Sequence, residues 1–540
     1  MLTFLRDHNY KVTQHLTTNL MLASMVMMTS VFSYGFENSV LSTIQAMTGE
    51  YFKFQSALMT TLTPNNRPAY ERQFGEKNAK TSEWEFSATR LAMLNSLPLI
   101  TYAIGVVGAS FIGERYGRRI VFVIINSFCL AGIALSYAGK SFDYAMAGRM
   151  IIQLHVGGEA WLVPMWMAEV VPAAVRGSMV GLYAFSHVLA GFIASVITDQ
   201  TSKMDDNNSW RIPVGCMFIF PSFAILTSFL LPESPRWLLR QGNHDKAVEM
   251  IYYLRSADRD FPAEAEIQHI QDTINETPTK GKWSELFKGT NARRTWGGLI
   301  AAGAVQLTGQ SFASNYGTIF LKSVGVIDPF TGTMIKRAGL LIGCIFVITF
   351  VEKIGRRRVA LVVGSISAAC LMVMGGLGTV TPPNPSAQKG VLAMSIIFPC
   401  AYMIAFGSTM TVVKSEIPHT ALRDKSNLLF WSFSNVANFL ATFTLPYLLK
   451  APYANLGSKV GFIYGCTSTL FVVLLFFFVP EMTGKSLEEI DEMFESRIPA
   501  WRSRGFKATG AAASVTKIGA HGRTSIDSAK ARGIEHVESK

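Results

Sequence analysis

The sequence predicts an all-α membrane protein with twelve transmembrane helices in two six-helix halves. Three observations support this prediction. Only 16% of the 540 residues are charged, whereas soluble proteins carry about 25% Asp, Glu, Lys and Arg. Charge-poor stretches of about 20 residues, the length that crosses a bilayer as a helix, alternate with short charged junctions. Three pairs of motifs recur in the same order in both halves of the chain.

Six apolar stretches in each half are expected to cross the membrane. In the first half they cover residues 20–47, 88–112, 120–139, 145–168, 178–197 and 211–231. In the second half they cover residues 297–320, 336–351, 359–379, 390–413, 428–450 and 458–479. Stretches of about 20 apolar residues are typical of membrane-spanning helices.

The remaining segments are polar. Residues 49–87 separate the first two helices, and residues 232–295 show helical periodicity around Ala247–Leu254. We therefore expect a short cytoplasmic N-terminus (1–19), an N-terminal six-helix half (20–231) and a helical cytoplasmic connector (232–295). A C-terminal six-helix half (296–480) and a basic cytoplasmic tail (481–540) follow.

The repeated motifs lie at the helix junctions. Glu114-Arg-Tyr-Gly-Arg-Arg119 recurs as Glu352-Lys-Ile-Gly-Arg-Arg357, and Glu169 with Arg176 recurs as Glu416 with Arg423. Pro232-Glu233 recurs as Pro480-Glu481. A nearly constant offset indicates duplication of a six-helix unit, an arrangement that in transporters puts the substrate site between the halves.

The net charge of +12 reflects membrane orientation. The basic residues cluster at the ends of apolar runs, as in Arg115–Arg119 and Arg356–Arg358, which indicates cytoplasmic junctions and not a nucleic-acid surface. Both termini are therefore expected in the cytoplasm, and the protein is expected in the plasma membrane, in contact with the lipid bilayer. Asn207, in a sequon between helices five and six, is the expected external glycosylation site.

The sequence gives no support to an enzyme or a primary pump. The six cysteines are scattered within apolar runs, which matches neither a disulfide framework nor a metal site. We find no ATP-binding loop, zinc-ligand spacing or nucleophile elbow. No cofactor or metal is therefore expected.

In combination, seven motifs resemble the sugar porter family of the major facilitator superfamily, and fungal members in particular. They are GERYGRR (113–119), GRM (148–150), AEVVPAAVRG (168–177), PESPRWL (232–238), QLTGQ (306–310), EKIGRR (352–357) and PEMTGKSLEEID (480–491). The resemblance covers residues 20–495. It implies the major facilitator fold, a bundle that works as a monomer and alternates between outward-open and inward-open states.

The resemblance also implies a cytoplasmic gate built from the charged junctions. Exposed ion pairs contribute only about 0–1 kcal/mol each, but a network that breaks together can separate two states. The predicted gate residues are Glu114, Arg115, Arg118, Arg119, Glu169, Arg176, Glu233, Arg236, Glu352, Arg356, Arg357, Glu416 and Arg423.

Glu37, at the end of an apolar run, is the first carboxylate expected within the membrane, where such groups usually have a function. Proton-coupled members of the family have an aspartate here that faces an arginine on helix four, which Arg149 matches. Burial opposes the charged form of Glu37 and Arg149 favours it. We expect Glu37 to take a proton outside and loosen its pairing with Arg149; a permanent ion pair is the alternative.

Two further groups on helix four depart from the family pattern of small residues. His155 and Glu159 are spaced i, i+4 and are expected to form a local hydrogen-bonded pair, with a place in the proton route as the alternative. His187 on helix five is expected to be structural.

The resemblance places a sugar against Gln306, Gln310, Ser311, Asn315, Phe406, Asn435 and Asn438. Val305, Ser311 and Phe406 replace a glutamine, an asparagine and a tryptophan of the family pattern. Because lost hydrogen-bond donors change discrimination between hydroxylated substrates, a standard glucose site is not expected. The alternative for this polar stripe is hydrogen bonding between helices.

The leading function is therefore import of a hexose or a related saccharide or polyol by proton symport. An uncoupled sugar facilitator, a quinate-like organic acid transporter and a non-transporting sugar sensor are the alternatives.

Overall fold

A computed structural model describes most of the chain. The described residues are 17–45, 76–77, 84–139, 141–171, 173–204, 208–255, 264, 267–268, 270–271, 282–380, 384–419, 422–450, 452–483, 485 and 487–506. Asn207, most of the N-terminus and of the loop 49–87, and residues 507–540 of the tail lie outside these ranges.

The N-terminal half contains six helical segments. They are α2 (Thr18–Ile44), α5 (Ala88–Ser96) continued by α6 (Pro98–Tyr116), α7 (Arg118–Ala138), α8 (Phe142–Val170), α9 (Ala173–Thr201), and α10 (Asn208–Cys216) continued by α11 (Ile219–Thr227) and η1 (Ser228–Leu230). Between α2 and α5, β1 (Glu76–Lys77) pairs antiparallel with β2 (Trp84–Glu85).

The C-terminal half repeats this count. Its segments are α15 (Gly289–Leu307) with α16 (Gln310–Ser314) and α17 (Gly317–Val324), α18 (Pro329–Phe346) with η3 (Val347–Val351) and α19 (Glu352–Ile354), and α20 (Arg356–Leu377). They continue with α21 (Pro385–Tyr402), η4 (Met403–Ser408) and α22 (Thr409–Glu416), then α23 (Arg423–Leu449), and η6 (Gly457–Lys459) with α24 (Val460–Phe478).

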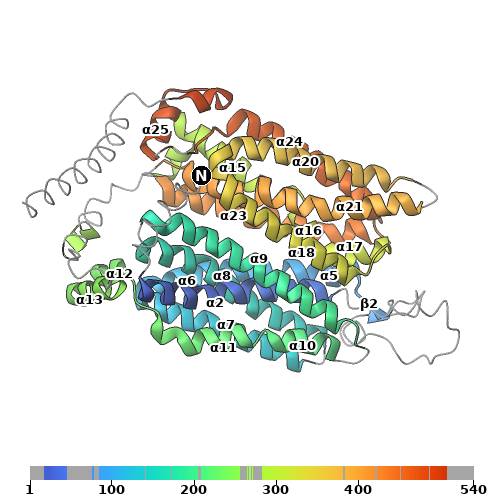
Figure 1. Ribbon diagram of the computed structural model, residues 1–540, viewed down its shortest axis with the longest axis horizontal. Helices are drawn as coiled ribbons and strands as arrows, with labels where there is room; N and C mark the ends of the chain where they lie inside the picture. The colour runs from blue at the N-terminus through green and yellow to red at the C-terminus, as the bar shows by residue number, and fades with distance from the viewer. Residues whose placement is uncertain are drawn as a thin grey trace, which may run out of the picture.

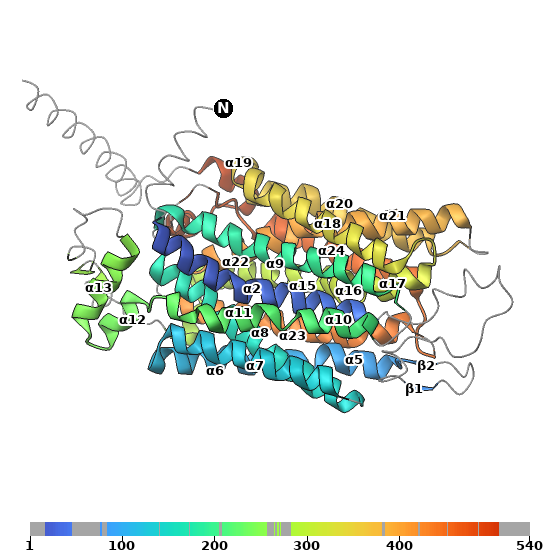
Figure 2. The same ribbon diagram turned by 60° about the horizontal axis from the view of Figure 1, so that its bottom comes forward.

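Short helices outside the bundle gather at one of its ends. α12 (Pro235–Arg240), α13 (His244–Arg255) and η2 (Trp283–Phe287) belong to the connector, and α25 (Leu487–Glu495) and η7 (Ala500–Gly505) to the tail. In Figure 1 the N-terminal half, blue to green, and the C-terminal half, yellow to red, lie side by side, with α12 and α13 at the left end. We call this the connector end and the opposite one, near β2, the far end; Figure 2 shows the same arrangement.

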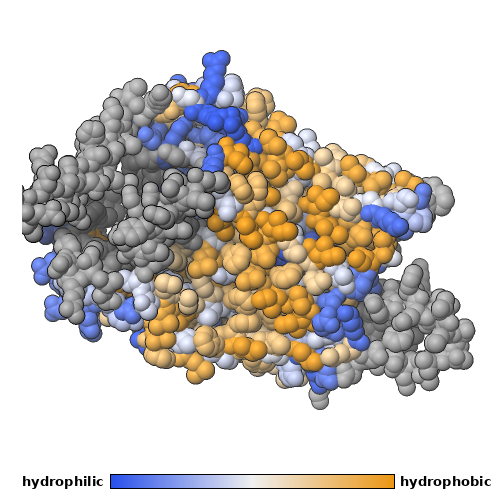
Figure 3. Space-filling model, in the orientation of Figure 1, coloured by the Kyte–Doolittle hydropathy of each residue, from blue (hydrophilic) through white to orange (hydrophobic). Residues whose placement is uncertain are grey.

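The surface of the bundle is apolar between its two ends. Figure 3 shows a hydrophobic belt across the bundle with hydrophilic residues toward both ends. Large apolar side chains such as Phe111, Leu226 and Ile342 are exposed on the surface, as expected where lipid is the solvent. In the described part of the chain, ten helical segments are long and apolar enough to cross a membrane. The all-α membrane fold is thereby confirmed.

The other two predicted spans differ from simple apolar helices for visible reasons. α8 carries Arg149 and Glu159 within its length. The seventh span is interrupted after Leu307, because Gly309 adopts a left-handed conformation with φ +100°, which glycine tolerates and other residues rarely do. The span predicted over residues 297–320 is therefore broken at this glycine, and the sequence analysis did not predict the break.

The same span also begins earlier than its apolar residues suggest. α15 begins at Gly289, inside the predicted connector. Its first turns carry Arg294, which forms an ion pair with Asp491 of α25, and Arg293, which donates to the backbone oxygen of Ile498 at 2.8 Å. The tail therefore stabilises polar helical turns that lie beyond the apolar stretch.

Candidate functional site

A buried ion pair holds the connector end of the N-terminal half together. Arg118, the first residue of α7, donates to both carboxylate oxygens of Glu169 near the end of α8, at 2.8 Å from Nε and 2.7 Å from Nη2. Its Nη1 donates to the backbone oxygen of Gly113 at 2.7 Å. The side chains of the pair are 1% and 5% exposed. Such a bidentate pair fixes the relative position of α7 and α8.

Glu233, just after the last helix of this half, adds a second contact at the same place. Its carboxylate accepts the backbone N–H of Arg118 at 2.8 Å and that of Arg119 at 3.2 Å. These N–H groups begin α7 and lack partners within the helix, and a negative charge there is also favoured by the helix dipole. Gly117 makes the preceding turn with φ +94°.

The C-terminal half repeats both contacts. Arg356, the first residue of α20, forms an ion pair with Glu416 at the end of α22. Glu481 accepts the backbone N–H of Arg356 at 3.0 Å and that of Arg357 at 3.2 Å, and Gly355 precedes them with φ +105°. The repeated sequence motifs thus carry the same hydrogen-bond pattern in the two halves.

The tail supports the copy in the C-terminal half. Lys485 donates from Nζ to the backbone oxygens of Ser503, at 2.6 Å, and Glu481, at 3.3 Å. Burial lowers the pKa of Lys485, and the negative charges of Glu481 and Glu489 partly offset this effect. The lysine therefore ties the segment after α24 to the end of the described tail.

Several predicted gate residues take no part in these ion pairs. The side chains of Glu114, Arg115 and Arg119 are exposed, and that of Arg236 is half-buried. The backbone oxygen of Glu114 nevertheless accepts a hydrogen bond from Trp237 Nε1 of the connector at 2.9 Å. This contact ties α12 to the end of α6.

The predicted pair of Glu416 with Arg423 does not form. Glu416 forms its ion pair with Arg356 instead. The Nε of Arg423 is buried and has no hydrogen-bond partner among the described residues. Arg357 donates to the backbone oxygen of Val479 at 3.0 Å. The side chains of Arg176 and Glu352 lie outside the described part of the structure.

Replacing Gly117 or Gly355 by alanine is expected to lower the thermal unfolding midpoint of the purified protein. A β-carbon at either position would overlap the carboxylate of Glu233 or Glu481, and the positive φ adds strain of about 1–3 kcal/mol. Gly108→Ala is the matched control, because nothing lies within 4 Å of its added β-carbon. Equal midpoints for Gly117→Ala and the control would contradict the role of this turn.

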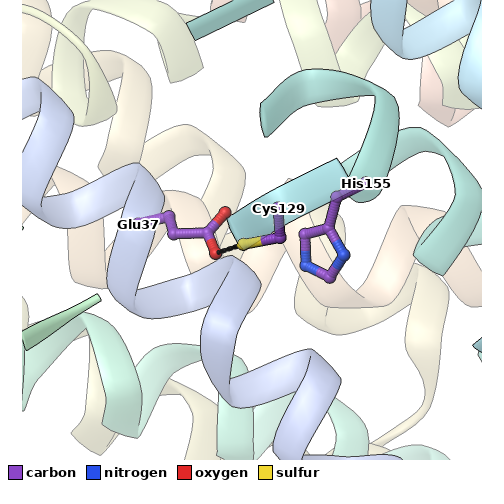
Figure 4. Close-up of side chains that lie close together, drawn as sticks. All are labelled: Glu37, Cys129 and His155. Atoms are coloured by element: carbon purple, nitrogen blue, oxygen red, sulfur yellow. Dashed lines mark hydrogen bonds between the residues drawn. The ribbon is translucent and has the colours of Figure 1, made fainter. Parts of the chain in front are cut away.

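Within the membrane, Glu37 of α2 lies in a fully buried cluster with Cys129 of α7 and His155 of α8. One carboxylate oxygen accepts from Ser33 Oγ at 2.5 Å and from Cys129 Sγ at 2.6 Å. The other carboxylate oxygen has no hydrogen-bond partner in the described part of the chain. Figure 4 shows the carboxylate pointing toward the thiol, with the imidazole ring of His155 beyond it. Neutral donors alone therefore hold this carboxyl group.

The predicted pairing of Glu37 with Arg149 is absent from this structure. Arg149 donates to Asn95 Oδ1 at 2.8 Å and to the backbone oxygen of Leu41 at 3.4 Å, one turn further along α2. Asn95 also exchanges two hydrogen bonds with Gln45, at 3.0 and 3.1 Å. The guanidinium thus donates to neutral acceptors on two other helical segments, α2 and α5. The sequence of helix four alone does not indicate these partners.

The predicted local pair of His155 with Glu159 does not form either. Glu159 accepts from the hydroxyl of Tyr183 on α9 at 3.4 Å and leaves its other oxygen without a partner. Among the described residues, neither buried ring nitrogen of His155 forms a hydrogen bond with another side chain. His187 packs its ring against Tyr34, with centroids 4.4 Å apart. The i, i+4 spacing puts His155 and Glu159 on the same face of α8. The ring of His155, however, lies beside Cys129 of α7 and Glu37 of α2.

Glu37, Cys129 and His155 also have the donor types that zinc accepts. Their ligand atoms lie within 4.8 Å of one another. A structural zinc site requires four ligands and a deprotonated thiol, and no fourth His, Cys, Asp or Glu joins this group in the described residues. The cluster is therefore best described as a carboxyl group with hydrogen-bonding neighbours.

Part of the predicted substrate set comes together where the seventh span is broken. Ser311 Oγ lies 2.8 Å from Thr442 Oγ1 and 3.2 Å from Asn438 Oδ1 of α23. Gln310 accepts from Ser311 at 3.4 Å. Gln306 is half-buried with an unpartnered side-chain oxygen. Ser311 of the short helix α16 thus meets Asn438 and Thr442 of α23, and a polar cluster at a broken helix is typical of binding sites in transporters.

The other predicted substrate residues are less well placed to contact a substrate. Phe406 is fully buried, 6.3 Å from the ring of Tyr402, and a β-carbon on Gly364 would meet its ring. Asn435 donates to the backbone oxygen of Trp431 on its own helix at 3.1 Å. Asn315 is half-buried. The structure therefore assigns Phe406 to the packed core in this state.

Sequence reasoning missed aromatic contacts between the halves. Tyr102 of α6 stacks on Trp431 of α23 with centroids 5.7 Å apart. Tyr316 donates to the backbone oxygens of Leu91, at 3.3 Å, and Thr442, at 3.2 Å. Aromatic residues are common in apolar spans, so no pattern distinguished these two.

The halves are joined at the far end of the bundle. Thr331 of α18 donates to Asp199 of α9 at 2.8 Å, and Lys450 donates to the backbone oxygen of Phe86. The connector-end ion pairs described above each lie within one half. The structure therefore has its halves closed against each other at the far end.

A family model and yeast sugar transporters match most of this chain. The family model described as "Sugar (and other) transporter" matches residues 19–494. The low-affinity glucose transporter HXT1 of Saccharomyces cerevisiae is 31% identical over 449 residues, which cover 80% of this chain and 77% of that protein. The galactose transporter of the same yeast is 30% identical over 452 residues, covering 81% and 77%.

Solved structures show the same fold. The partially occluded inward-open xylose transporter XylE from E. coli matches with a TM-score of 0.67 and 18% identity, over 87% of this chain and 100% of that one. The proton:xylose symporter XylE bound to 6-bromo-6-deoxy-D-glucose matches with a TM-score of 0.65 and 19% identity, over 88% and 99%. The predicted major facilitator fold is thereby confirmed.

Proposed function

Since this chain belongs to the sugar transporter family, we propose that it imports a hexose or a related saccharide or polyol by proton symport. Family membership places the protein among transporters and not enzymes. Relatives named as glucose and galactose transporters support a sugar substrate. The polar cluster of Gln310, Ser311 and Asn438 at the broken seventh span offers the hydrogen-bonding groups that a hydroxylated substrate needs.

Proton coupling rests on one observation above all, the fully buried carboxyl of Glu37 held only by Ser33 and Cys129. A carboxylate without a cationic partner at this depth favours its protonated form. In our proposal, Arg149 leaves Asn95 and approaches Glu37 when the carboxyl loses its proton. The present structure then corresponds to the protonated stage, in which the two side chains are apart.

The connector-end contacts give each half its rigidity in this scheme. Arg118–Glu169 and Arg356–Glu416 join helices within one half, so the halves can move as bodies while their contacts with each other change. With the far end closed, the connector end is the side on which substrate is released. We place this end in the cytoplasm, because the arginine-rich junctions lie there, and the protein in the plasma membrane as a monomer.

A transport assay tests the function directly. The full chain, expressed in cells that lack hexose uptake, is expected to restore growth and to accumulate labelled hexose in a manner that an uncoupler abolishes. Equal uptake with and without the uncoupler would favour a facilitator. Surface expression without any uptake would contradict the proposal and favour a sensor.

Asn438→Ala is expected to raise the KM for the transported sugar about tenfold or more, because loss of a hydrogen-bonding partner in a buried site costs about 1–3 kcal/mol. Asn438 accepts hydrogen bonds from both Ser311 and Thr442. Thr444→Ala on the same helix is the control, since Thr444 is exposed and bonds only backbone oxygens of its own helix. Concentration-dependent uptake measures both, and equal KM values would remove Asn438 from the substrate site.

A further inference from the structure

Two cations lie next to each other inside the membrane on α18. Lys336 and Arg337 are 4% and 8% exposed, about two turns inside a segment that crosses the bilayer. Ionisable groups at such depth are costly, and they usually face a functional pathway. The proposed transport cycle gives neither of them a role.

Lys336 points to the break in the seventh span. Its Nζ donates to the backbone oxygen of Ala313 in α16 at 2.7 Å. Gly317 makes room for this ammonium group, because a β-carbon there would overlap Nζ. Since an ammonium group has three N–H donors, Lys336 retains donors at α16, the short helix that also carries Gln310 and Ser311.

Arg337 reaches the opposite half. An added β-carbon on Gly191 of α9 would lie 3.4 Å from Arg337 Nη1 and 3.7 Å from the backbone oxygen of Gly35 on α2. The guanidinium therefore lies where α18 meets α9 and α2. Among the residues that the structure describes, its buried Nε has no hydrogen-bond partner, and neither has Nε2 of His187, on which the charge of Arg337 acts.

No described carboxylate forms an ion pair with either cation. Glu37 and Glu159 are bound by neutral donors. Asp199 accepts from Thr331 and pairs with Lys203. Two adjacent positive charges are thus buried with no counter-charge from the described residues, an arrangement that is strongly unfavourable unless a negative group is supplied.

We propose that the substrate supplies this group: Lys336 and Arg337 bind the carboxylate of an acidic sugar, such as a hexuronic acid. Guanidinium and ammonium groups both bind carboxylates, and a guanidinium can do so with two parallel (bidentate) hydrogen bonds. Gln310, Ser311 and Asn438 then bind the hydroxyl groups. The inference rests on the proposed sugar transport and specifies its substrate class.

The charge balance of transport follows from this assignment. A uronate anion that enters with one proton carries no net charge across the membrane, whereas a neutral hexose that enters with one proton carries one positive charge. Uptake of the uronate is therefore expected to be insensitive to membrane potential at fixed pH gradient.

The test compares matched pairs of sugars on the full chain in proteoliposomes. One pair is galactose and galacturonate, and the other is glucose and glucuronate. In each assay one sugar of a pair is labelled and the other is added unlabelled as competitor. The wild type is expected to prefer a uronate over its parent hexose by about tenfold or more, the scale of a charge-assisted hydrogen bond. Arg337→Gln and Lys336→Gln are expected to lower uronate uptake about tenfold more than hexose uptake, and so to abolish this preference.

Arg358→Gln, which removes an exposed arginine of the same half, is the control and is expected to keep the preference. Thermal stabilisation of purified wild type and variants by each sugar gives a second measure of binding that does not depend on transport. No preference for a uronate in the wild type, or equal loss of both sugars in Arg337→Gln, would overturn the inference. If no sugar of either kind enters, the proposed transport function itself fails; if hexose enters and uronate does not compete, only the acidic substrate class fails.

Discussion

Glu37→Gln is expected to abolish sugar accumulation driven by a pH gradient while leaving exchange of sugar down its own gradient. Glutamine keeps the shape of the side chain and an oxygen that accepts from Ser33 and Cys129, but it has no proton to exchange. One pH unit corresponds to about 1.4 kcal/mol, enough for about tenfold accumulation at one proton per sugar. The accumulation ratio in vesicles with an imposed pH gradient should therefore fall from about ten to about one.

The control for this experiment is Glu249→Gln, which neutralises an exposed carboxylate on the connector helix α13. It should accumulate sugar as the wild type does. Measuring counterflow in the same vesicles separates coupling from folding, because an intact Glu37→Gln protein still exchanges sugar. Undiminished accumulation in Glu37→Gln would remove this residue from the proton route.

Removal of Arg118 is expected to have the largest effect on stability. Arg118→Ala leaves the carboxylate of Glu169 buried without its partner, and breaking a buried ion pair in this way costs about 3–5 kcal/mol. The variant also loses the hydrogen bond to the backbone oxygen of Gly113. The free energy of unfolding, or the thermal midpoint in detergent, measures the loss.

A double-mutant cycle isolates the pair itself. Glu169→Gln in the Arg118→Ala background should cost much less than it does alone, because the partner of the carboxylate is already missing. Arg240→Ala, which removes an exposed arginine of α12 at the same end, should change stability by less than about 0.5 kcal/mol. Additive effects of Arg118→Ala and Glu169→Gln would show that the two side chains are not coupled.

Local sequence patterns were sufficient to predict the helices and the repeated junctions. Lipid requires long apolar runs, so spans such as α7 and α20 are visible in composition alone. The repetition of the junctions was predictable because Glu169, Glu233 and Arg118 recur as Glu416, Glu481 and Arg356. The partners were not, since Glu416 was expected to pair with Arg423 and pairs with Arg356 instead. A duplicated unit repeats its contacts along with its residues.

Side-chain partners inside the bundle could not be predicted in the same way. Arg149 pairs with Asn95, which lies on a different span, and no spacing within helix four indicates this. The depth of Lys336 and Arg337 in the membrane could not be predicted, because the apolar stretch of the sequence begins only at residue 336. The helix begins at Pro329 instead, where Asp328 accepts the N–H of Thr331 at 2.8 Å and caps it.

The position of Glu233 has a consequence for how the protein is made. This carboxylate follows the last helix of its half and reaches back to the start of α7, so the residues of the Arg118, Glu169 and Glu233 contacts are all encoded before residue 234. Domains generally fold as units, the N-terminal one first during synthesis. The first half can therefore reach its final packing while the ribosome is still translating the connector, and the second half, with Glu481 in the same place, then folds against a finished partner.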